Sequence, residues 1–236
     1  MTVALPSMLK TFLEFHFCGE LLLIDPAGIL YWPDQKLLVV SDLHLEKGSS
    51  FAAHHKTMLP PYDTHKTLEK LSRCTNVWNP AVVISLGDSF HDLNASARLP
   101  KHCKELLSNL MAQREWIWVC GNHDPLPPEE LGGSFCFDVQ IGPLNFLHEP
   151  KERFKTGEIA GHFHPAAKIR QRGKTIRKRC MACDGRRIVM PAFGAFTGGL
   201  NVRDPAYDGL FDWPNLSAWL LGQDAVYKID GNRLCL

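Results

Sequence analysis

Long hydrophobic runs are missing from this sequence. No apolar stretch approaches the roughly 20 residues that a membrane-spanning helix needs. The N-terminus also lacks a basic region followed by a hydrophobic segment and a small-residue cleavage site, as a secretory signal would have. The sequence therefore predicts a soluble protein that stays in the compartment where it is made.

A disulfide framework is missing as well. Eight cysteines are scattered over 236 residues, whereas domains stapled by disulfides are much denser in cysteine. Cys180 and Cys183 alone have the spacing of a metal-binding pair, and a zinc ribbon needs a second pair that the sequence does not provide. We therefore expect reduced thiols, with this pair on one strand, and a cytoplasmic location.

The sequence also lacks a large net charge, internal repeats and low-complexity segments. The formal net charge is +1, charged residues make up 22% and hydrophobic residues 45%, which excludes an intrinsically disordered chain. A length of 236 residues suits one hydrophobic core better than two. We predict a single domain over residues 1–236.

Functional polar residues are instead concentrated in five short segments. Four of them follow apolar runs typical of buried strands, at residues 36–41, 81–86, 115–120 and 158–160. Because α/β proteins bind ligands where strands end, we expect these side chains to gather along one edge of a sheet. The segments are Asp42-Leu43-His44, Gly87-Asp88-Ser89-Phe90-His91, Gly121-Asn122-His123-Asp124, His148 and Gly161-His162-Phe163-His164-Pro165.

The donor atoms of these segments suit a pair of divalent metal ions. Two ions about 3.5–4 Å apart need a carboxylate that bridges them, together with further oxygen and imidazole ligands. Each fragment alone is more often structural, because Asp-x-His carries little information and Gly-Asp is a common turn pair. Their shared order and their positions after strands favour a two-metal phosphoesterase site.

The order and spacing of the five segments resemble those of calcineurin-like metallophosphoesterases. Strings beyond the metal ligands, at residues 43–52, 59–64, 157–166 and 191–202, look like the ligase-associated DNA-damage-response endonucleases, a bacterial branch of that superfamily. The resemblance extends from about Leu21 to about Asp212. It implies an α/β fold with two packed mixed β-sheets flanked by helices, that is, a four-layer α/β/β/α sandwich.

The resemblance also implies roles for individual residues. Asp88 would bridge the two ions. Asp42, His44 and His164 would complete the shell of one ion, and Asn122, His148 and His162 that of the other. Mixed imidazole, carboxylate and amide donors suit manganese, iron or zinc, and the resemblance favours Mn²⁺.

The catalytic residues expected beside the ions are His123, Asp124 and His91. His123 would stabilise developing charge or protonate the leaving oxygen, with Asp124 orienting its ring. His91 either contacts a phosphate oxygen or only forms hydrogen bonds within its loop. The ions lower the pKa of a water that attacks phosphorus directly, so no covalent enzyme intermediate is required.

Basic residues are concentrated between positions 168 and 187. This segment holds nine basic residues and one acidic residue, although the chain as a whole is nearly neutral. Because it begins four residues after His164, we expect it to lie beside the metals and to bind a polyanion. A hairpin whose cations only face solvent is the alternative. The predicted nucleic-acid contacts are Arg170, Arg172, Lys174, Arg177, Lys178 and Arg179.

These observations favour a metal-dependent DNA endonuclease of DNA repair that acts on single-stranded DNA in functional association with a DNA ligase and a helicase. Two alternatives stay open. Similar centres hydrolyse many esters, so the protein could be a small-molecule phosphodiesterase or a phosphoprotein phosphatase. It could also be a nucleic-acid-binding platform whose metal centre is vestigial.

The remaining pattern predicts the elements around the site. We expect a hairpin from strands 21–24 and 29–32, a polar loop over 47–64, a helix over 65–74 with Leu68 and Leu71 inward, and a second helix from near Pro100. Further strands are expected at 135–141, 144–148, 158–160, 167–171, 175–180 and 186–190.

Overall fold

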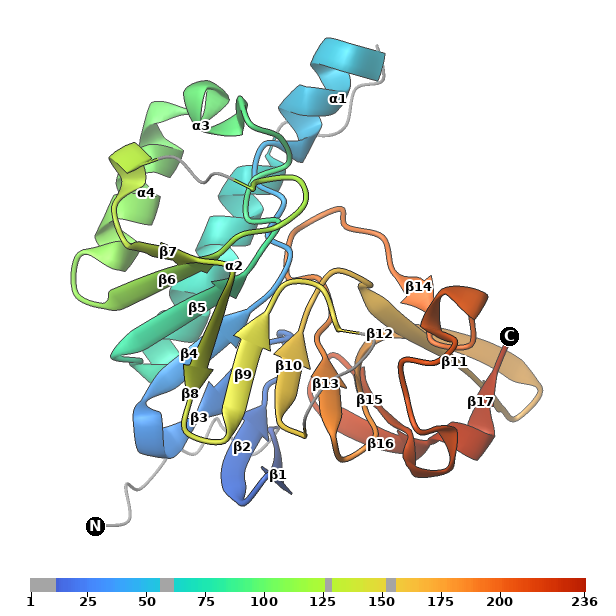
Figure 1. Cartoon of the computed structure of the whole chain (residues 1–236). Coiled ribbons are helices and arrows are strands. Elements are labelled where there is room, and N and C mark those ends of the chain that lie inside the picture. The colour runs from blue at the N-terminus through green and yellow to red at the C-terminus, as the bar shows by residue number, and fades with distance from the viewer. Residues whose placement is uncertain (1–11, 56–61, 126–128, 152–155) are drawn as a thin grey trace.

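The computed structural model describes residues 12–55, 62–125, 129–151 and 156–236, and in it two β-sheets pack face to face (Figure 1). The first sheet has seven strands in chain order. Strands β1 to β4 pair antiparallel, whereas β4 to β7 run parallel, so the carboxyl ends of β4, β5 and β6 lie at the same edge. The strands are β1 (Leu13–Phe17), β2 (Glu20–Ile24), β3 (Leu30–Trp32), β4 (Leu37–Val40), β5 (Val82–Leu86), β6 (Glu115–Val119) and β7 (Ser134–Cys136).

The second sheet uses the C-terminal half of the chain. Its main path runs β14-β11-β12-β13-β10-β9-β8, with β15 beside β12 and β16, and β17 beside β11. Neighbours β9, β10 and β13 are parallel, and most other pairs are antiparallel. The strands are β8 (Asp138–Ile141), β9 (Leu144–Leu147), β10 (Glu158–Ala160), β11 (Pro165–Gln171), β12 (Lys174–Cys183), β13 (Arg187–Val189), β14 (Leu200–Asn201), β15 (Ser217–Leu221), β16 (Val226–Asp230) and β17 (Leu234–Cys235).

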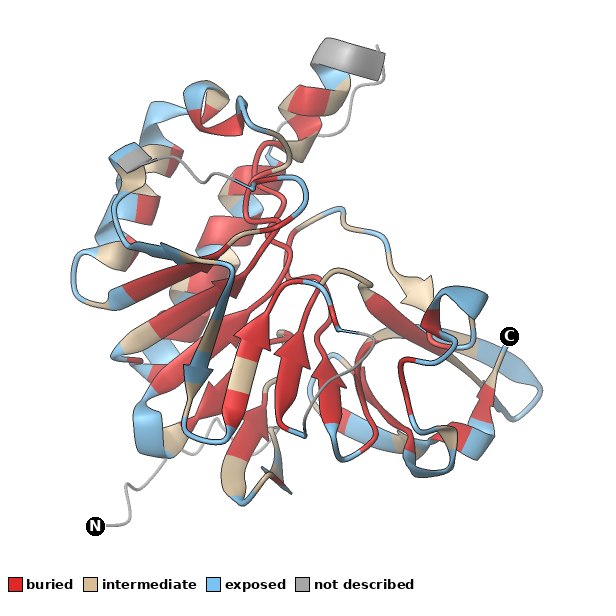
Figure 2. Cartoon of the chain, viewed as in Figure 1, coloured by how far each residue is buried: buried red, intermediate tan, exposed pale blue. Residues whose placement is uncertain are grey.

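Strands at the centre of the first sheet consist mostly of buried residues (Figure 2). Because side chains alternate along a strand, β4 contributes to two hydrophobic cores. Leu38 and Val40 pack on the helix side, whereas Leu37 and Val39 pack between the sheets, together with residues of the second sheet such as Phe146. The two packed mixed sheets expected from the sequence are confirmed.

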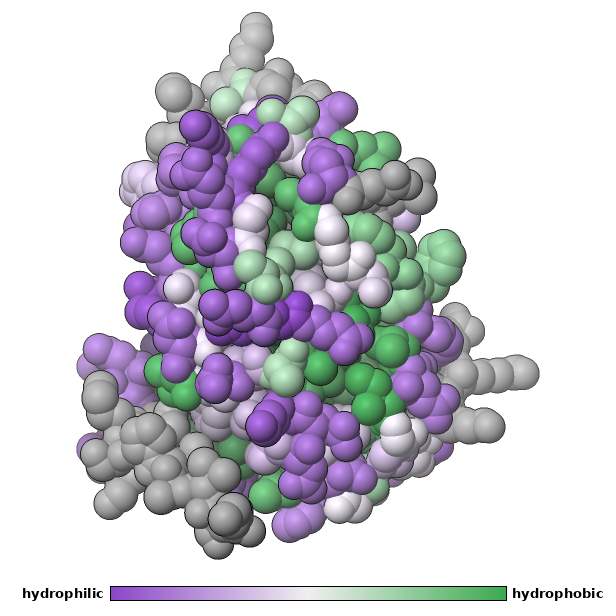
Figure 3. All heavy atoms as spheres, turned by 90° about the vertical axis from the view of Figure 1, so that its left-hand side faces the viewer, coloured by the Kyte–Doolittle hydropathy of each residue, from purple (hydrophilic) through white to green (hydrophobic). Residues whose placement is uncertain are grey.

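Helices cover the outer face of the first sheet. Leu68 and Leu71 of α2 and Leu107 of α4 share a core with the sheet, and Figure 3 shows that this side of the molecule presents many hydrophilic residues to solvent. The helix expected over 65–74 is confirmed and is longer at both ends; it stops at Asn79, which has left-handed backbone (φ 43°). The α-helices are α1 (Lys47–His55), α2 (Asp63–Trp78), α3 (Ala95–Arg98) and α4 (Lys101–Met111).

The outer face of the second sheet is covered differently. Tyr207 and Phe211 pack over Ala182 and Ala218 of that sheet, and in the described ranges this cover contains short 3₁₀-helices but no α-helix. The 3₁₀-helices of the structure are η2 (Pro33–Gln35), η3 (Glu129–Leu131), η4 (Pro205–Tyr207), η5 (Trp213–Asn215) and η6 (Gly231–Arg233).

The prediction of a polar loop over 47–64 is wrong in its first part, because residues 47–55 form α1 instead. The start of α1 is held by partners that are distant in sequence. The amide of Gly48 donates to Asp63 Oδ2 at 2.9 Å, and the amide of Glu46 donates to Thr64 Oγ1 at 2.7 Å. Residues 56–61 of the expected loop lie outside the described residues.

The single strand expected over 135–141 is divided between the two sheets. β7 pairs with β6 of the first sheet, whereas β8 pairs with β9 of the second. Phe137 lies between them and is 81% exposed. The chain therefore crosses from one sheet to the other at this residue.

All eight cysteines are unpaired, and Cys180 and Cys183 lie buried on β12 as expected. Within the described part of the chain, no helix combines the length and apolar character needed to cross a membrane.

Candidate metal centre

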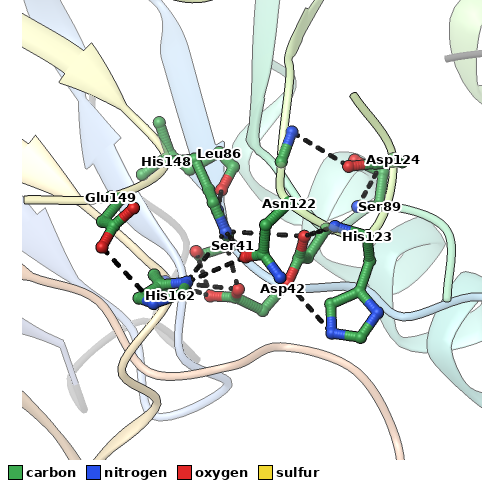
Figure 4. A network of polar contacts seen from close by, with 12 residues as sticks. Ser41, Asp42, Leu86, Ser89, Asn122, His123, Asp124, His148, Glu149 and His162 are labelled. Carbon is green, nitrogen blue, oxygen red and sulfur yellow. Dashed lines mark hydrogen bonds and ion pairs between the residues drawn. The ribbon is translucent and has the colours of Figure 1, made fainter. Parts of the chain in front are cut away.

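Loops that follow β4, β5, β6, β9 and β10 meet at one edge of the paired sheets (Figure 4). The structure brings together in these loops all seven residues that the sequence predicts as metal ligands. They are Asp42, His44, Asp88, Asn122, His148, His162 and His164.

The backbone of five of these residues is left-handed. The φ angles are 52° at Asp42, 44° at His44, 47° at Asp88, 70° at His162 and 46° at His164. Residues other than glycine rarely adopt this conformation, and such strain concentrates at functional sites that the surrounding structure holds in place. The turns direct both polar residues of Asp42-Leu43-His44 into the cluster.

Gly121 and Gly161 have no space for a side chain, which explains why glycine opens two of the loops. A Cβ atom at Gly121 would collide with the amide nitrogen and a carboxylate oxygen of Asp88. A Cβ atom at Gly161 would collide with Ser41 Oγ and lie 2.7 Å from Asp42 Oδ2. The loops therefore pack directly against the residues that carry the donor atoms.

Asp42, His44 and His164 form the first donor group, whose ligand atoms lie within 4.8 Å of one another. His164 Nε2 lies 3.3 Å from Asp42 Oδ1 and 3.3 Å from His44 Nε2. Burial lowers the pKa of His44 to about 2, although Asp42 opposes the shift. The ring is therefore neutral near pH 7 and offers a free nitrogen lone pair.

Asp88, His148 and His162 form the second donor group, also within 4.8 Å. Asn122 Oδ1 joins it, at 2.9 Å from His148 Nε2 and 3.0 Å from His162 Nδ1. His148 Nδ1 donates to the carbonyl oxygen of Leu86 at 2.9 Å. This contact fixes the tautomer of His148 and leaves Nε2 as an acceptor that points into the group.

Asp88 lies between the two donor groups. Its Oδ1 atom is 3.5 Å from His148 Nε2, and its Oδ2 atom is 3.9 Å from His44 Nε2. The amide of His123 donates to Oδ1 at 2.9 Å and helps to fix the carboxylate. One carboxylate thus presents an oxygen to each group.

The chemistry of these donors fits metal ions. In each group two imidazole nitrogens approach within 3.2 or 3.3 Å of each other beside a buried carboxylate. Convergent nitrogen lone pairs and carboxylate oxygens suit a divalent cation, whose charge offsets the cost of burying the carboxylates.

His123 lies at the open side of the cluster, with 41% of its side chain exposed. Its Nδ1 atom is 3.0 Å from the carbonyl oxygen of His91, and its Nε2 atom is 3.9 Å from Asp88 Oδ2. The half-buried ring of His91 stacks on that of His123 and places Nδ1 3.4 Å from Nδ1 of His44. Burial, followed by the charge of His123, lowers the pKa of His91 to about 4.

Asp124 has different partners from those expected. Its carboxylate accepts the amides of Ser89 at 2.7 Å, Phe90 at 3.1 Å and Gly121 at 3.0 Å. Among the described residues, the ring of His123 is oriented by the carbonyl of His91 and not by Asp124. Asp124 therefore connects two of the loops, and the expectation that it orients the His123 ring is corrected.

The basic segment forms the β11–β12 hairpin, which runs away from the metal centre (Figure 1). At about 3.3 Å per residue, Arg172 at the turn lies roughly 23 Å along the strand from Pro165. The expectation that the whole segment lies beside the metals is therefore wrong, and only the base of the hairpin is near them. The exposed predicted contacts are Arg170, Arg172, Lys174, Arg177 and Lys178.

Three cations of this segment, the exposed Arg177 among them, have partners within the protein. Arg179 is half-buried and donates to the carbonyl of Ala192 at 2.7 Å. Arg177 donates to the carbonyl of Gly199. Arg187 is fully buried and forms an ion pair with Glu158 at 2.5 Å, so it does not belong to the exposed basic surface.

Sequence reasoning missed Ser41, whose hydroxyl donates to Asp42 Oδ2. It also missed cations of α2 that lie close to Arg179, namely Lys70 and Arg73. Lys66, Lys70 and Arg73 recur at intervals of four and three residues, which is a detectable helical spacing.

A family model described as calcineurin-like phosphoesterase matches residues 35–187. With the donor groups at the strand ends, this match shows that the chain belongs to the calcineurin-like phosphoesterase family and is a metal-dependent phosphoesterase.

The solved structures that are similar to this chain include two whose functions are stated. The crystal structure of Pseudomonas putida nuclease MPE shares 26% identity with a TM-score of 0.70, and the match covers 92% of this chain and 100% of that one. The phosphoesterase Yfce from E. coli shares 14% identity with a TM-score of 0.41, covering 82% of this chain and 97% of that one. The search of curated proteins found no match.

Proposed function

We propose that this protein is a two-metal-dependent phosphodiesterase that acts as a DNA endonuclease. The observation that carries the proposal is the position of Asp88, whose carboxylate oxygens face different donor groups. A carboxylate shared between two ions is a central requirement of two-metal hydrolysis. The similarity to a nuclease supports a nucleic acid as the substrate.

We propose Mn²⁺ as the native metal, with iron or zinc as alternatives, because the donors mix imidazole, carboxylate and amide groups. When bound, two such ions would polarise a phosphodiester and lower the pKa of a water, which could then attack phosphorus directly. Asp42, His44, Asp88 and His164 would hold one ion, and Asp88, Asn122, His148 and His162 the other.

His123 is the proposed acid at the leaving oxygen. Its Nδ1 atom is held by the carbonyl of His91 at 3.0 Å, so Nε2 is the nitrogen available to a substrate. In the charged form of the ring, Nε2 carries a proton that can stabilise developing charge or pass to the leaving group. We assign His91 and Asp124 to positioning: His91 supports the His123 ring, and Asp124 connects the loops.

The exposed cations of the β11–β12 hairpin form a proposed contact surface for the DNA backbone. Arg170, Arg172, Lys174 and Lys178 are exposed on this hairpin, and cations beside phosphates provide sequence-independent affinity. The exposure of Asn122 and His123 supports a polymeric substrate over a small one, because long chains need an open centre.

A finer proposal concerns the biological setting. The residue strings at 157–166 and 191–202 support a role in DNA repair on single-stranded DNA, beside a DNA ligase and a helicase. Eight unpaired cysteines support a reducing compartment such as the cytoplasm. The core shared by both sheets supports residues 1–236 as a single domain.

An activity panel tests this proposal. The substrates are bis-p-nitrophenyl phosphate, p-nitrophenyl phosphate, circular single-stranded DNA, duplex DNA and RNA, each with several divalent metals and after chelation. We expect hydrolysis of the diester and internal cleavage of circular single-stranded DNA, both restored by Mn²⁺. Preference for the monoester with no DNA cleavage would favour the phosphatase alternative, and binding without any hydrolysis would favour a platform with a vestigial centre.

A further inference from the structure

A groove of about 520 Å³ lies between α2 and residues 193–197. Four cationic side chains line it, three from α2 and one from β12, together with two phenylalanines whose rings lie beside Lys66 and Lys70. These residues are Lys66, Lys70, Arg73, Arg179, Phe193 and Phe196.

The cations come from both halves of the fold. Lys66, Lys70 and Arg73 occupy one face of α2, because positions three and four residues apart are neighbours on a helix. Arg179 approaches from the base of the β11–β12 hairpin. The acidic residue of the lining is Glu69, which already pairs with His65 at 3.3 Å. The groove therefore has an excess of positive charge.

Lys70 is the most enclosed of the α2 cations. Its Nζ atom donates to the carbonyl of Phe193 at 3.1 Å and lies 3.7 Å from the centre of the Phe193 ring. Burial, followed by the positive charge of Arg179, lowers the pKa of Lys70 to about 7. An anion in the groove would favour the charged form of this lysine.

Two exposed aromatic rings lie at the rim of the groove. Phe196 is 43% exposed and Tyr62 is 44% exposed, with ring centroids 5.9 Å apart. Lys66 Nζ lies 4.2 Å from the centre of the Tyr62 ring. Exposed aromatic rings beside cations are the combination with which proteins hold single-stranded nucleic acid, because rings stack on bases and cations contact phosphates.

The wall of the groove is attached to the metal centre. The amide of Phe193 donates to the carbonyl of Ser41 at 2.8 Å, and the amide of Gly194 donates to the carbonyl of Asp42 at 3.2 Å. On the other side, the amide of Ala195 donates to Thr67 Oγ1 of α2 at 2.9 Å. A chain lying in this groove would therefore leave it next to the loop that carries Asp42.

We propose that this groove binds the single-stranded DNA that flanks the cleaved phosphodiester. Lys66, Arg73 and Arg179 contact its phosphates, and Tyr62 and Phe196 stack on its bases. The inference rests on the proposed nuclease function and adds a contact surface, lined by α2 and Arg179, to that of the hairpin. Because stacking needs unpaired bases, the groove also provides a preference for single strands over duplexes.

The test compares two groove variants with a matched control. One variant combines Lys66→Gln and Arg73→Gln, and the other combines Tyr62→Ala and Phe196→Ala. The control combines Lys101→Gln and Lys228→Gln, which remove two exposed cations from α4 and β16. Binding of fluorescently labelled oligothymidylate and of a duplex of equal length is measured by anisotropy in chelator, over a range of salt concentrations.

For the cation variant, the slope of log association constant against log salt should become shallower by about 1.4, since each phosphate contact on a single strand contributes about 0.7. For the aromatic variant, binding of oligothymidylate should weaken by about tenfold or more with an unchanged slope, whereas binding of the duplex should change little. If both groove variants bind oligothymidylate with the same affinity and the same salt slope as the control, the proposal is overturned.

Hydrolysis of bis-p-nitrophenyl phosphate separates this proposal from the proposed function. In the groove variants, cleavage of single-stranded DNA should fall at least about tenfold more than hydrolysis of the small diester, because stacking and phosphate contacts are lost only on DNA. If the groove variants weaken DNA binding but the wild-type protein hydrolyses no diester, the nuclease function is refuted and the groove remains a DNA-binding site. If the wild-type protein is active but the groove variants lose DNA cleavage and diester hydrolysis to the same extent, the proposal that the groove binds DNA is refuted.

Discussion

The ring of His123 stacks on the ring of His91, with centroids 5.1 Å apart and planes inclined by 19°. The same two residues are joined by a contact of 3.0 Å between His123 Nδ1 and the carbonyl oxygen of His91. The backbone of His91 therefore sets the orientation of His123, and its side chain supports the ring. Because the His91 backbone and side chain have separate roles, substitutions of His123 and of His91 should differ in their effects on turnover.

Replacing His123 by Ala should reduce turnover by on the order of a hundredfold or more, because the proposed proton donor is lost. Metal content should stay at the wild-type value, since the His123 ring lies outside both donor groups. Steady-state hydrolysis of bis-p-nitrophenyl phosphate and elemental analysis of the same sample check both statements. Metal loss in this variant would show that His123 acts as a ligand.

Replacing His91 by Ala should have a smaller effect than the substitution of His123. The substitution keeps the carbonyl that contacts His123 Nδ1 and removes only the stacked ring. A stacked aromatic pair contributes about 0.5–1.5 kcal/mol, so turnover should fall by no more than about tenfold. A loss as large as that of His123→Ala would mean that the His91 ring itself contacts the reacting phosphate.

Replacing Gly121 by Ala should weaken metal binding without removing any donor atom. The new methyl group would collide with the backbone and carboxylate of Asp88, and this would displace the carboxylate from its position between the donor groups. Gly198→Ala is the matched control, because no atom lies within 4 Å of a Cβ built there. When metal is titrated in and activity is measured, Gly121→Ala should need a higher metal concentration than the wild type, whereas Gly198→Ala should not. Equal metal affinity in the two variants would contradict the packing argument.

Replacing both Lys174 and Lys178 by Gln tests the hairpin as a DNA contact. Both side chains are exposed, so their loss should make the salt dependence of oligothymidylate binding shallower by about 1.4 if each contacts one phosphate. The control is again the pair Lys101→Gln and Lys228→Gln. An unchanged slope would indicate that the cations of the hairpin only face solvent.

The site was predictable from the sequence to a large extent because it depends on strand order. Asp42, Asp88 and Asn122 each follow a parallel strand of the first sheet, and parallel neighbours bring their carboxyl ends to one edge. His148 has no local motif of its own, yet its position after β9 brings it to the same edge.

Features that depend on contacts between distant segments were not predictable. The start of α1 depends on Asp63 and Thr64, which lie 15 and 18 residues from their partners in sequence. The direction of the basic hairpin depends on the pairing of β11 with β12, β14 and β17. A cluster of cations in sequence therefore gave no information about its distance from the metals. Pairing across the fold also brings Arg179 beside α2.

The number of metal ions bound per chain, measured together with diester hydrolysis, tests the central claim most directly. After chelation, the wild-type protein should regain activity as it takes up two equivalents of Mn²⁺, since Asp88 presents one oxygen to each donor group. Asp88→Ala should bind less metal and lose at least about a hundredfold in turnover at the same Mn²⁺ concentration. Full wild-type activity with a single equivalent, or near wild-type turnover of Asp88→Ala, would contradict the two-metal account.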